Sequence, residues 1–146
     1  MNIFKFVVLL LCGILITSCA TTYKQAKTPT SAGYYDTLLQ QGMYEITFNG
    51  NADTSTTTAQ DYTLLRAAEV CIENGYKTFD IVNLNDNSKT ETSVYTSYYG
   101  RRFADTTIST NTYPKIAIII KCSKEEDLSF VAEEIRTNLR KKLNLN

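Results

Sequence analysis

The sequence predicts an α+β fold: a two-layer sandwich in which two helices cover one face of a mostly antiparallel sheet of three to five strands. The domain follows an N-terminal signal peptide and a tether. Three observations predict this fold. Apolar residues alternate along 43–50, recur at helical spacing along 58–74, and occupy both faces of a short run at 115–122. Helices packed on one face of such a sheet bury both apolar surfaces in the simplest way.

The first residues have the pattern of an export signal. Lys5 precedes the apolar run Phe6–Ile16, which is too short to cross a bilayer comfortably. Ile16–Cys19 then resembles the lipobox of bacterial lipoproteins: an aliphatic residue, a spacer, a small residue and a cysteine. The resemblance implies cleavage between Ser18 and Cys19 and attachment of a diacylglyceryl group to the Cys19 thiol. The alternatives are an ordinary signal peptide with a chance cysteine and an anchor that is never cleaved.

The residue after the cysteine bears on location. It is Ala20 rather than Asp, which by resemblance to lipoprotein sorting signals implies the periplasmic face of the outer membrane in a cell with two membranes. Two or three acyl chains would hold the protein there stably, and the membrane is then its first partner. We expect a signal peptide over 1–18, a lipidated polar tether over 19–42, and one globular α+β domain over 43–146. Partial order is expected within the tether, where Gly33–Tyr35 and Leu38–Leu39 could pack back on the domain.

The first strand and helix of the domain have clear local signals. Met43–Gly50 alternates as a half-buried strand does. A helix is expected from about Thr58 to Asn74, begun by a capping box of Thr57 with Gln60 or of Thr58 with Asp61. Gly75 follows it, where a left-handed residue ends many helices.

The middle of the domain is predicted to be a hairpin. Residues 77–84 read as a strand with Phe79 and Ile81 on one face and Val82 and Leu84 on the other. The turn-forming run 85–88 then leads into a returning strand that ends near residue 99. Residues 100–112 fit either a further strand or an irregular loop.

The C-terminal part is predicted to hold a central strand and a helix. Lys115–Cys122 is apolar on both faces, as a central strand is. Ser123 with Glu126 fits a capping box, and an apolar stripe then continues at helical spacing to Leu143. Acidic residues crowd the first turn of this expected helix and basic residues its last.

Part of this pattern resembles a family of small bacterial lipoproteins of unknown function. Its members carry a lipobox, a strand ending in F-x-G, a helix reading R-A-A-E, a G-[YF] turn and an aromatic-aliphatic strand. The matching residues are Phe48, Gly50, Tyr62, Leu65, Arg66, Ala67, Ala68, Glu69, Gly75, Tyr76 and Phe79. The resemblance covers about half of the mature chain and implies a location and a fold but no activity. Arg66 and Glu69, three apart on a helix, are expected to pair structurally; the alternative is that they line a pocket.

Composition excludes several functions. Lys plus Arg and Asp plus Glu are both 15, so nothing favours a nucleic-acid partner. The chain has no His, which removes the usual metal ligand and the usual acid-base group at neutral pH. No Gly-rich phosphate loop or metal-ligand spacing occurs. Carboxylates are plentiful, so a glycosidase pair stays open as an alternative, although no spacing points to one. We expect no enzyme activity, no cofactor and no metal site.

One aromatic and basic stretch suits a contact surface. Tyr and Arg are enriched at binding hot spots, and they gather here in a set made of Tyr95, Tyr98, Tyr99, Arg101, Arg102 and Phe103. A hairpin with cross-strand aromatic pairs and solvated arginines would explain the same stretch without any partner.

Two function classes remain open. The first is a non-enzymatic envelope component that acts by contact with an envelope protein or peptidoglycan. The second is a periplasmic binding or sensor module for a small ligand.

The sequence leaves the pairing of Cys71 and Cys122 open. An exported chain can join them in a disulfide, but the close approach that a disulfide needs favours two separate thiols.

Overall fold

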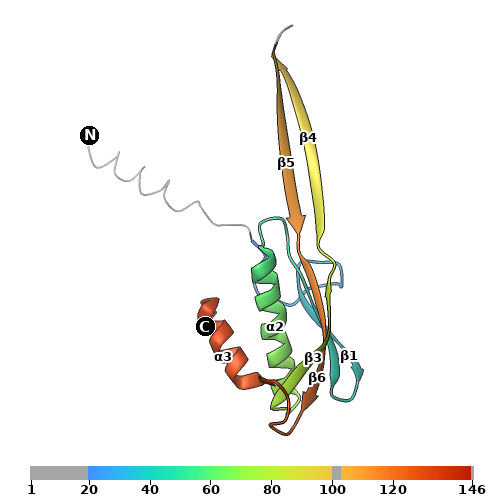
Figure 1. Ribbon diagram of the computed structural model, residues 1–146, viewed down its shortest axis with the longest axis vertical. Helices are drawn as coiled ribbons and strands as arrows, with labels where there is room; N and C mark the ends of the chain where they lie inside the picture. The colour runs from blue at the N-terminus through green and yellow to red at the C-terminus, as the bar shows by residue number, and fades with distance from the viewer. Residues whose placement is uncertain (1–19, 100–102, 146) are drawn as a thin grey trace, which may run out of the picture.

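The computed structural model describes residues 20–99 and 103–145 and shows a body from which a long ribbon of two strands projects (Figure 1). The elements in chain order are β1 (Gly33–Gln40), β2 (Met43–Asn49), α2 (Thr56–Glu73), β3 (Thr78–Asp86), β4 (Lys89–Tyr99), β5 (Phe103–Tyr113), β6 (Lys115–Ser123), β7 (Phe130–Val131) and α3 (Ala132–Lys142).

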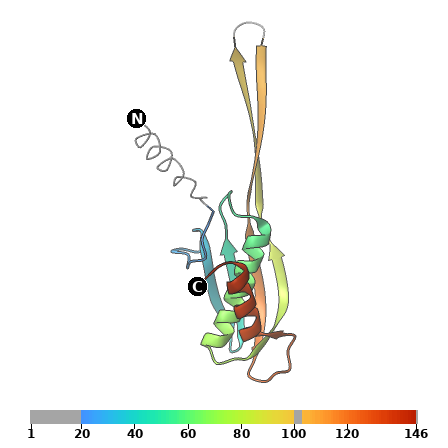
Figure 2. The ribbon, with the colours of Figure 1, turned by 90° about the vertical axis from the view of Figure 1, so that its left-hand side faces the viewer.

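The body is a five-stranded sheet with strand order β1-β2-β6-β3-β7, and every pair in it is antiparallel. Helix α2 packs on one face of this sheet and α3 lies against α2 on the same side (Figure 2). The predicted α+β architecture is therefore confirmed.

The core lies between α2 and the two central strands. Ile46 and Phe48 of β2 pair with Ile118 and Ile116 of β6, and all four are buried. The small side chains at Ala67 and Ala68 are fully buried too. They let α2 approach the sheet closely, so the apolar stripe of the helix is covered.

The C-terminal end of α2 is as predicted, but its start is not. Gly75 adopts a φ of 75°, and the amide of Tyr76 donates to the Cys71 carbonyl at 2.9 Å. These features form the glycine-ended helix terminus expected from the sequence. The N-cap is Ser55, whose hydroxyl accepts from the amide of Thr58 at 3.0 Å, so neither predicted capping box begins the helix.

The predicted assignment of side chains to the two faces of β3 is wrong, because the strand contains a β-bulge. The pairing with β6 shifts between Ile81 and Asn83, which leaves one extra residue, Val82, in β3. A bulge reverses the alternation of side chains beyond it. Leu84 therefore lines the same cavity as Ile81, rather than pointing to the opposite face.

The predicted hairpin between 77–84 and the strand after it is wrong. β4 does not fold back on β3 but continues away from the body and pairs with β5 from Lys89↔Tyr113 to Tyr99↔Phe103. The segment 103–113 is thus a strand, one of the two predicted alternatives. The amide of Asn87 donates to the Lys115 carbonyl at 2.9 Å, so the β3–β6 pairing runs into the ribbon without a turn at 85–88.

The last helix begins later than predicted. The Ser123 hydroxyl accepts from the nearby amide of Glu125 at 3.1 Å and caps no helix. Phe130 and Val131 instead pair with the start of β3 as β7. Because sheet pairing uses these residues, the helix starts at Ala132.

The predicted tether over 19–42 requires the largest correction. Thr21 is 7% exposed, and its amide donates to the Thr54 hydroxyl at 3.0 Å. Gly33–Gln40 forms an edge strand of the sheet. The folded domain therefore begins near Thr21 rather than near Met43, because the backbone of 33–40 pairs with β2. The expected partial order at Gly33–Tyr35 and Leu38–Leu39 is a complete strand.

Cys71 and Cys122 form a disulfide, with their α-carbons 6.0 Å apart, so the prediction of separate thiols is wrong. The turn after α2 explains the approach. The amide of Lys77 donates to the Ser123 carbonyl at 2.8 Å, which places the start of β3 beside the end of β6. The last turn of α2 then lies directly over Cys122.

Candidate functional site

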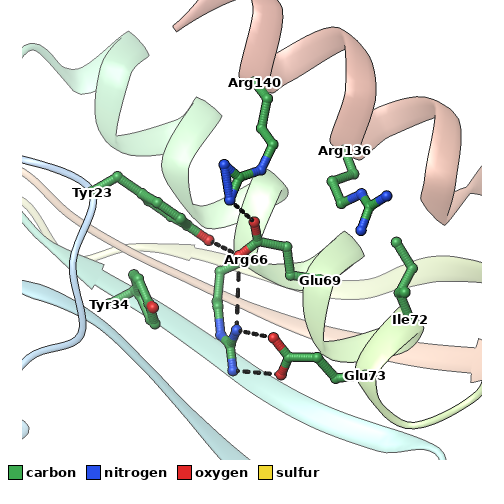
Figure 3. A pocket seen from close by; sticks show the side chains of 8 residues that line it. All are labelled: Tyr23, Tyr34, Arg66, Glu69, Ile72, Glu73, Arg136 and Arg140. Atoms are coloured by element: carbon green, nitrogen blue, oxygen red, sulfur yellow. Dashed lines mark hydrogen bonds and ion pairs between the residues drawn. The ribbon is translucent and has the colours of Figure 1, made fainter. Parts of the chain in front are cut away.

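The structure brings the predicted pair Arg66 and Glu69 to the wall of a polar cavity of about 460 Å³. The cavity lies where α2, α3, β1 and the N-terminal segment meet (Figure 3). Its lining consists of Tyr23, Tyr34, Arg66, Glu69, Ile72, Glu73, Arg136 and Arg140. We call the hydrogen-bonded and ion-paired residues around Arg66 the Arg66 cluster. Its members are Tyr23, Arg66, Glu69, Glu73 and Arg140 of this wall, together with Asp36 of β1, which contacts Arg66 from outside the lining.

Arg66 is the centre of the cluster. Its guanidinium forms a two-pronged contact with the Glu73 carboxylate, at 2.8 and 3.1 Å. Its Nε donates to Asp36 of β1 at 2.9 Å, and its charge lies 4.9 Å from the centre of the Tyr34 ring. Burial lowers the pKa of Arg66, but the hydrogen bonds that it donates to Glu73 and Asp36, together with their negative charges, outweigh that effect and raise the pKa overall. Arg66 thus ties α2 to the edge strand β1.

Glu69 joins the other segments. It accepts a hydrogen bond from the Tyr23 hydroxyl, and its second oxygen lies 3.3 Å from Arg140 of α3. The predicted contact with Arg66 is present but longer, at 3.8 Å. Burial and the bond to the Glu69 carboxylate both raise the pKa of Tyr23 above its ordinary value. Tyr23 also packs against the rings of Tyr34 and Tyr62.

The polar and charged groups of the Arg66 cluster find their hydrogen-bond and ion-pair partners within the protein. Within the described part of the chain no buried polar side-chain atom lacks a hydrogen-bond partner. Glu73 already pairs with Arg66, and Glu69 already pairs with Arg140. The arrangement joins four segments electrostatically and leaves Arg136, which also pairs with Glu133, at the rim of the cavity.

Sequence reasoning missed most of this cluster. Glu73 follows Arg66 by seven residues, two helical turns along the same face, and this spacing was a usable signal. Tyr23 and Asp36 gave none, because they lie in the segment read as a tether. Arg140 belongs to the basic end of the predicted last helix, and nothing in its spacing links it to Glu69.

The second candidate site is the ribbon formed by β4 and β5, each strand being eleven residues long. It leaves the body beside the N-terminal end of α2 (Figures 1 and 2). Tyr95, the first residue of the predicted contact patch, is 64% exposed on it. Tyr98, Tyr99 and Phe103 occupy backbone positions near the end of the ribbon, but their side chains lie outside the described part.

The remaining predicted residues are not placed. Arg101 and Arg102 lie outside the described residues, as do Ser18 and Cys19 at the expected cleavage and lipidation site. The roles assigned to them stay predictions.

The comparisons with known proteins add no relative. No family model matches the sequence, and no curated protein or solved structure matches it. Among residues 20–99 and 103–145, no helix combines the length and apolar character needed to cross a bilayer. In those same ranges no group of three or more Cys, Asp or Glu side chains gathers where it could hold a metal ion.

Proposed function

We propose that the protein is a lipid-anchored, non-enzymatic component of the bacterial envelope that acts through contacts made by the β4–β5 ribbon. The observation that carries the proposal is the ribbon itself. At about 3.4 Å per residue, its eleven-residue strands extend about 37 Å. An arm of this length, with exposed side chains such as Tyr95, suits contact with a partner better than catalysis.

Two further features support this proposal. The lipobox-like Ile16–Cys19 implies a membrane anchor. The Cys71–Cys122 disulfide suits an exported protein, because disulfides persist in oxidising compartments such as the periplasm. Outer-membrane attachment with the domain in the periplasm remains the location that we propose.

Crosslinking in the native envelope tests the contact role. A photoreactive phenylalanine analogue replaces Tyr95 on the ribbon or, as a matched control, the partly exposed Tyr35 of β1. We expect position 95 to capture an envelope protein or peptidoglycan and position 35 to capture much less. Equal capture from both positions would contradict the proposal.

The same crosslinking test can ask whether Arg101 and Arg102, two residues of the predicted contact patch, take part in the contact. Replacing Arg101 and Arg102 with Ser should reduce capture from position 95. The melting temperature should stay nearly unchanged, since the sequence predicts solvated arginines there and solvated charges contribute little to stability. Unaltered capture would remove these two residues from the contact.

A small-ligand binding module is the second candidate, favoured by the 460 Å³ cavity with Arg136 and Arg140 in its wall. It is the weaker candidate because the carboxylates and Arg66 already satisfy one another. Small anionic compounds that raised the melting temperature of wild-type protein, but not of an Arg136→Ala variant, would support it.

A further inference from the structure

The β4–β5 ribbon lacks the support that two-stranded sheets normally need. In the described part of the chain, β4 pairs with β5 alone, and these two strands form a sheet separate from that of the body. A lone two-stranded ribbon is marginally stable in water; a further strand, a helix or another apolar surface usually covers one face. The ribbon therefore has a face that is available for a partner.

The two faces of the ribbon differ in chemistry. One face of its described part contains only uncharged, β-branched residues; we call it the threonine face. Its members are Thr90, Thr92, Val94, Thr96, Thr106, Ile108, Thr110 and Thr112. The other face carries the ion pair of Lys89 with Glu91. It also carries Tyr95 opposite Thr107.

The threonine face has an apolar centre and matched ends. Val94 and Ile108 lie opposite each other and are 61% and 67% exposed. Threonine pairs lie on both sides of them, with hydroxyl oxygens 3.4 Å apart in the pairs Thr92–Thr110 and Thr96–Thr106. Each strand thus presents nearly the same side chains as its partner strand.

We propose that this face packs against the threonine face of a second copy of the chain. The face complements itself: its apolar centre can meet an identical centre, and its threonine rows can interdigitate. It carries no charge, so two copies do not repel each other, and it offers nothing to attract a charged partner. This inference deepens the proposed function by naming a partner for one face of the ribbon, while Tyr95 on the other face stays available to the envelope.

The position of Thr21, close to the expected anchor, also favours a second copy of the chain as the partner. Thr21, two residues after Cys19, is held by Asn51 and Thr54. The neighbouring Gly50 donates its amide to the Pro114 carbonyl at 2.8 Å, at the base of the ribbon. Thr21 and the base of the ribbon thus lie at the same end of the body. Anchoring would confine the copies to one membrane surface, which raises the effective concentration of their ribbons for each other.

Site-specific crosslinking of the full-length protein in membranes tests this contact. Ile108→Cys puts a thiol on the threonine face, and Thr107→Cys puts one on the adjacent residue of the other face. Packed sheets lie about 10 Å apart, which a short bis-maleimide can bridge. Cys71 and Cys122 are already joined and do not compete for the reagent. We expect a covalent dimer from Ile108→Cys and at least fivefold less from Thr107→Cys.

Charge substitutions provide the second test. Ile108→Glu and Ile108→Lys, combined with Val94→Cys as the crosslinking site, should each reduce dimer yield about tenfold, and co-expression of the two should restore it. The same charges at Thr107 should change the yield little. Equal yields from Ile108→Cys and Thr107→Cys, or no rescue on co-expression, would overturn the proposal.

Other outcomes are also decisive. If a polarity-sensitive dye on Ile108→Cys reports an apolar environment in membranes but no dimer forms, the bilayer covers the face and the proposal is wrong. If the dimer forms but position 95 captures no envelope partner, the self-contact stands and the wider contact function fails.

Discussion

At the scale of single residues, Tyr23 shows how a polar side chain holds a charged cluster together. Its ring packs between Tyr34 and Tyr62, and its hydroxyl donates to the Glu69 carboxylate. The same carboxylate also lies 3.3 Å from Arg140 and 3.8 Å from Arg66, so three side chains from three segments converge on it. Tyr23 fixes the N-terminal segment to α2, so the loss of its hydroxyl should lower the free energy of unfolding.

Tyr23→Phe should lower the free energy of unfolding at pH 7 by roughly 1–3 kcal/mol, the usual cost of losing a partly buried bond to a charged acceptor. The effect should depend on pH. The pKa of Tyr23 is raised in the folded state, so above pH about 10 the unfolded chain loses this proton first and stability falls as pH rises. The difference between wild type and variant should therefore shrink above that pH.

Urea unfolding followed by circular dichroism at several pH values measures this difference. Tyr95→Phe is the matched control, because its hydroxyl lies on an exposed side chain, and it should change stability by no more than about 0.5 kcal/mol. A constant difference between wild type and Tyr23→Phe from pH 7 to 11 would contradict the assignment.

At the scale of elements, the sequence predicts what local chemistry determines. The glycine that ends α2 and the buried strand β6 follow from neighbouring residues, so both predictions hold. The pairing of β4 with β5 rather than with β3 depends on the register carried out of the body, which no turn motif reveals. The start of α3 is likewise set by the pairing of β7 with β3, a contact distant in sequence.

The candidate sites divide in the same way. Arg66 and Glu69 could be singled out because they share one helix face. Their main partners could not, since Asp36 lies 30 residues away on a strand that the hydrophobic pattern did not mark. The tertiary fold, not the helix, makes this cluster.

The disulfide is the strongest link between two elements, α2 and β6. Its half-cystines are 51 residues apart, and closing a loop of that size restricts the unfolded chain by roughly 4 kcal/mol in the entropic model. Replacing both Cys71 and Cys122 with Ala should therefore lower the free energy of unfolding by roughly 2–4 kcal/mol.

Urea unfolding with and without reductant checks this loss. Reductant should destabilise the wild type and leave the double variant unchanged. In mass spectrometry of denatured, non-reduced wild type, neither thiol should be alkylated; alkylation of both would show that the bond is absent in the cell.

At the scale of the whole molecule, the described chain begins at the end of the body from which the ribbon projects. Buried structure begins at Thr21, so if Cys19 carries the lipid, little chain separates the body from the bilayer: two residues span at most about 7 Å. The base of the ribbon at Pro114 lies at that same end. Anchoring would therefore orient the protein as well as retain it, which a long flexible tether would not do.

Lipidation at Cys19 is the premise of this orientation, and it can be tested directly. Cys19→Ala should abolish incorporation of a clickable fatty acid, because the variant lacks the thiol that the lipobox presents for acylation. Cys12→Ala is the matched control, since it removes the other cysteine of the leader without touching the lipobox-like Ile16–Cys19, and it should be labelled like the wild type. Gel fluorescence after labelling in cells measures both. Equal labelling of Cys19→Ala and wild type would refute the anchor. The position of Thr21 near the base of the ribbon would then say nothing about how the protein is oriented on a membrane.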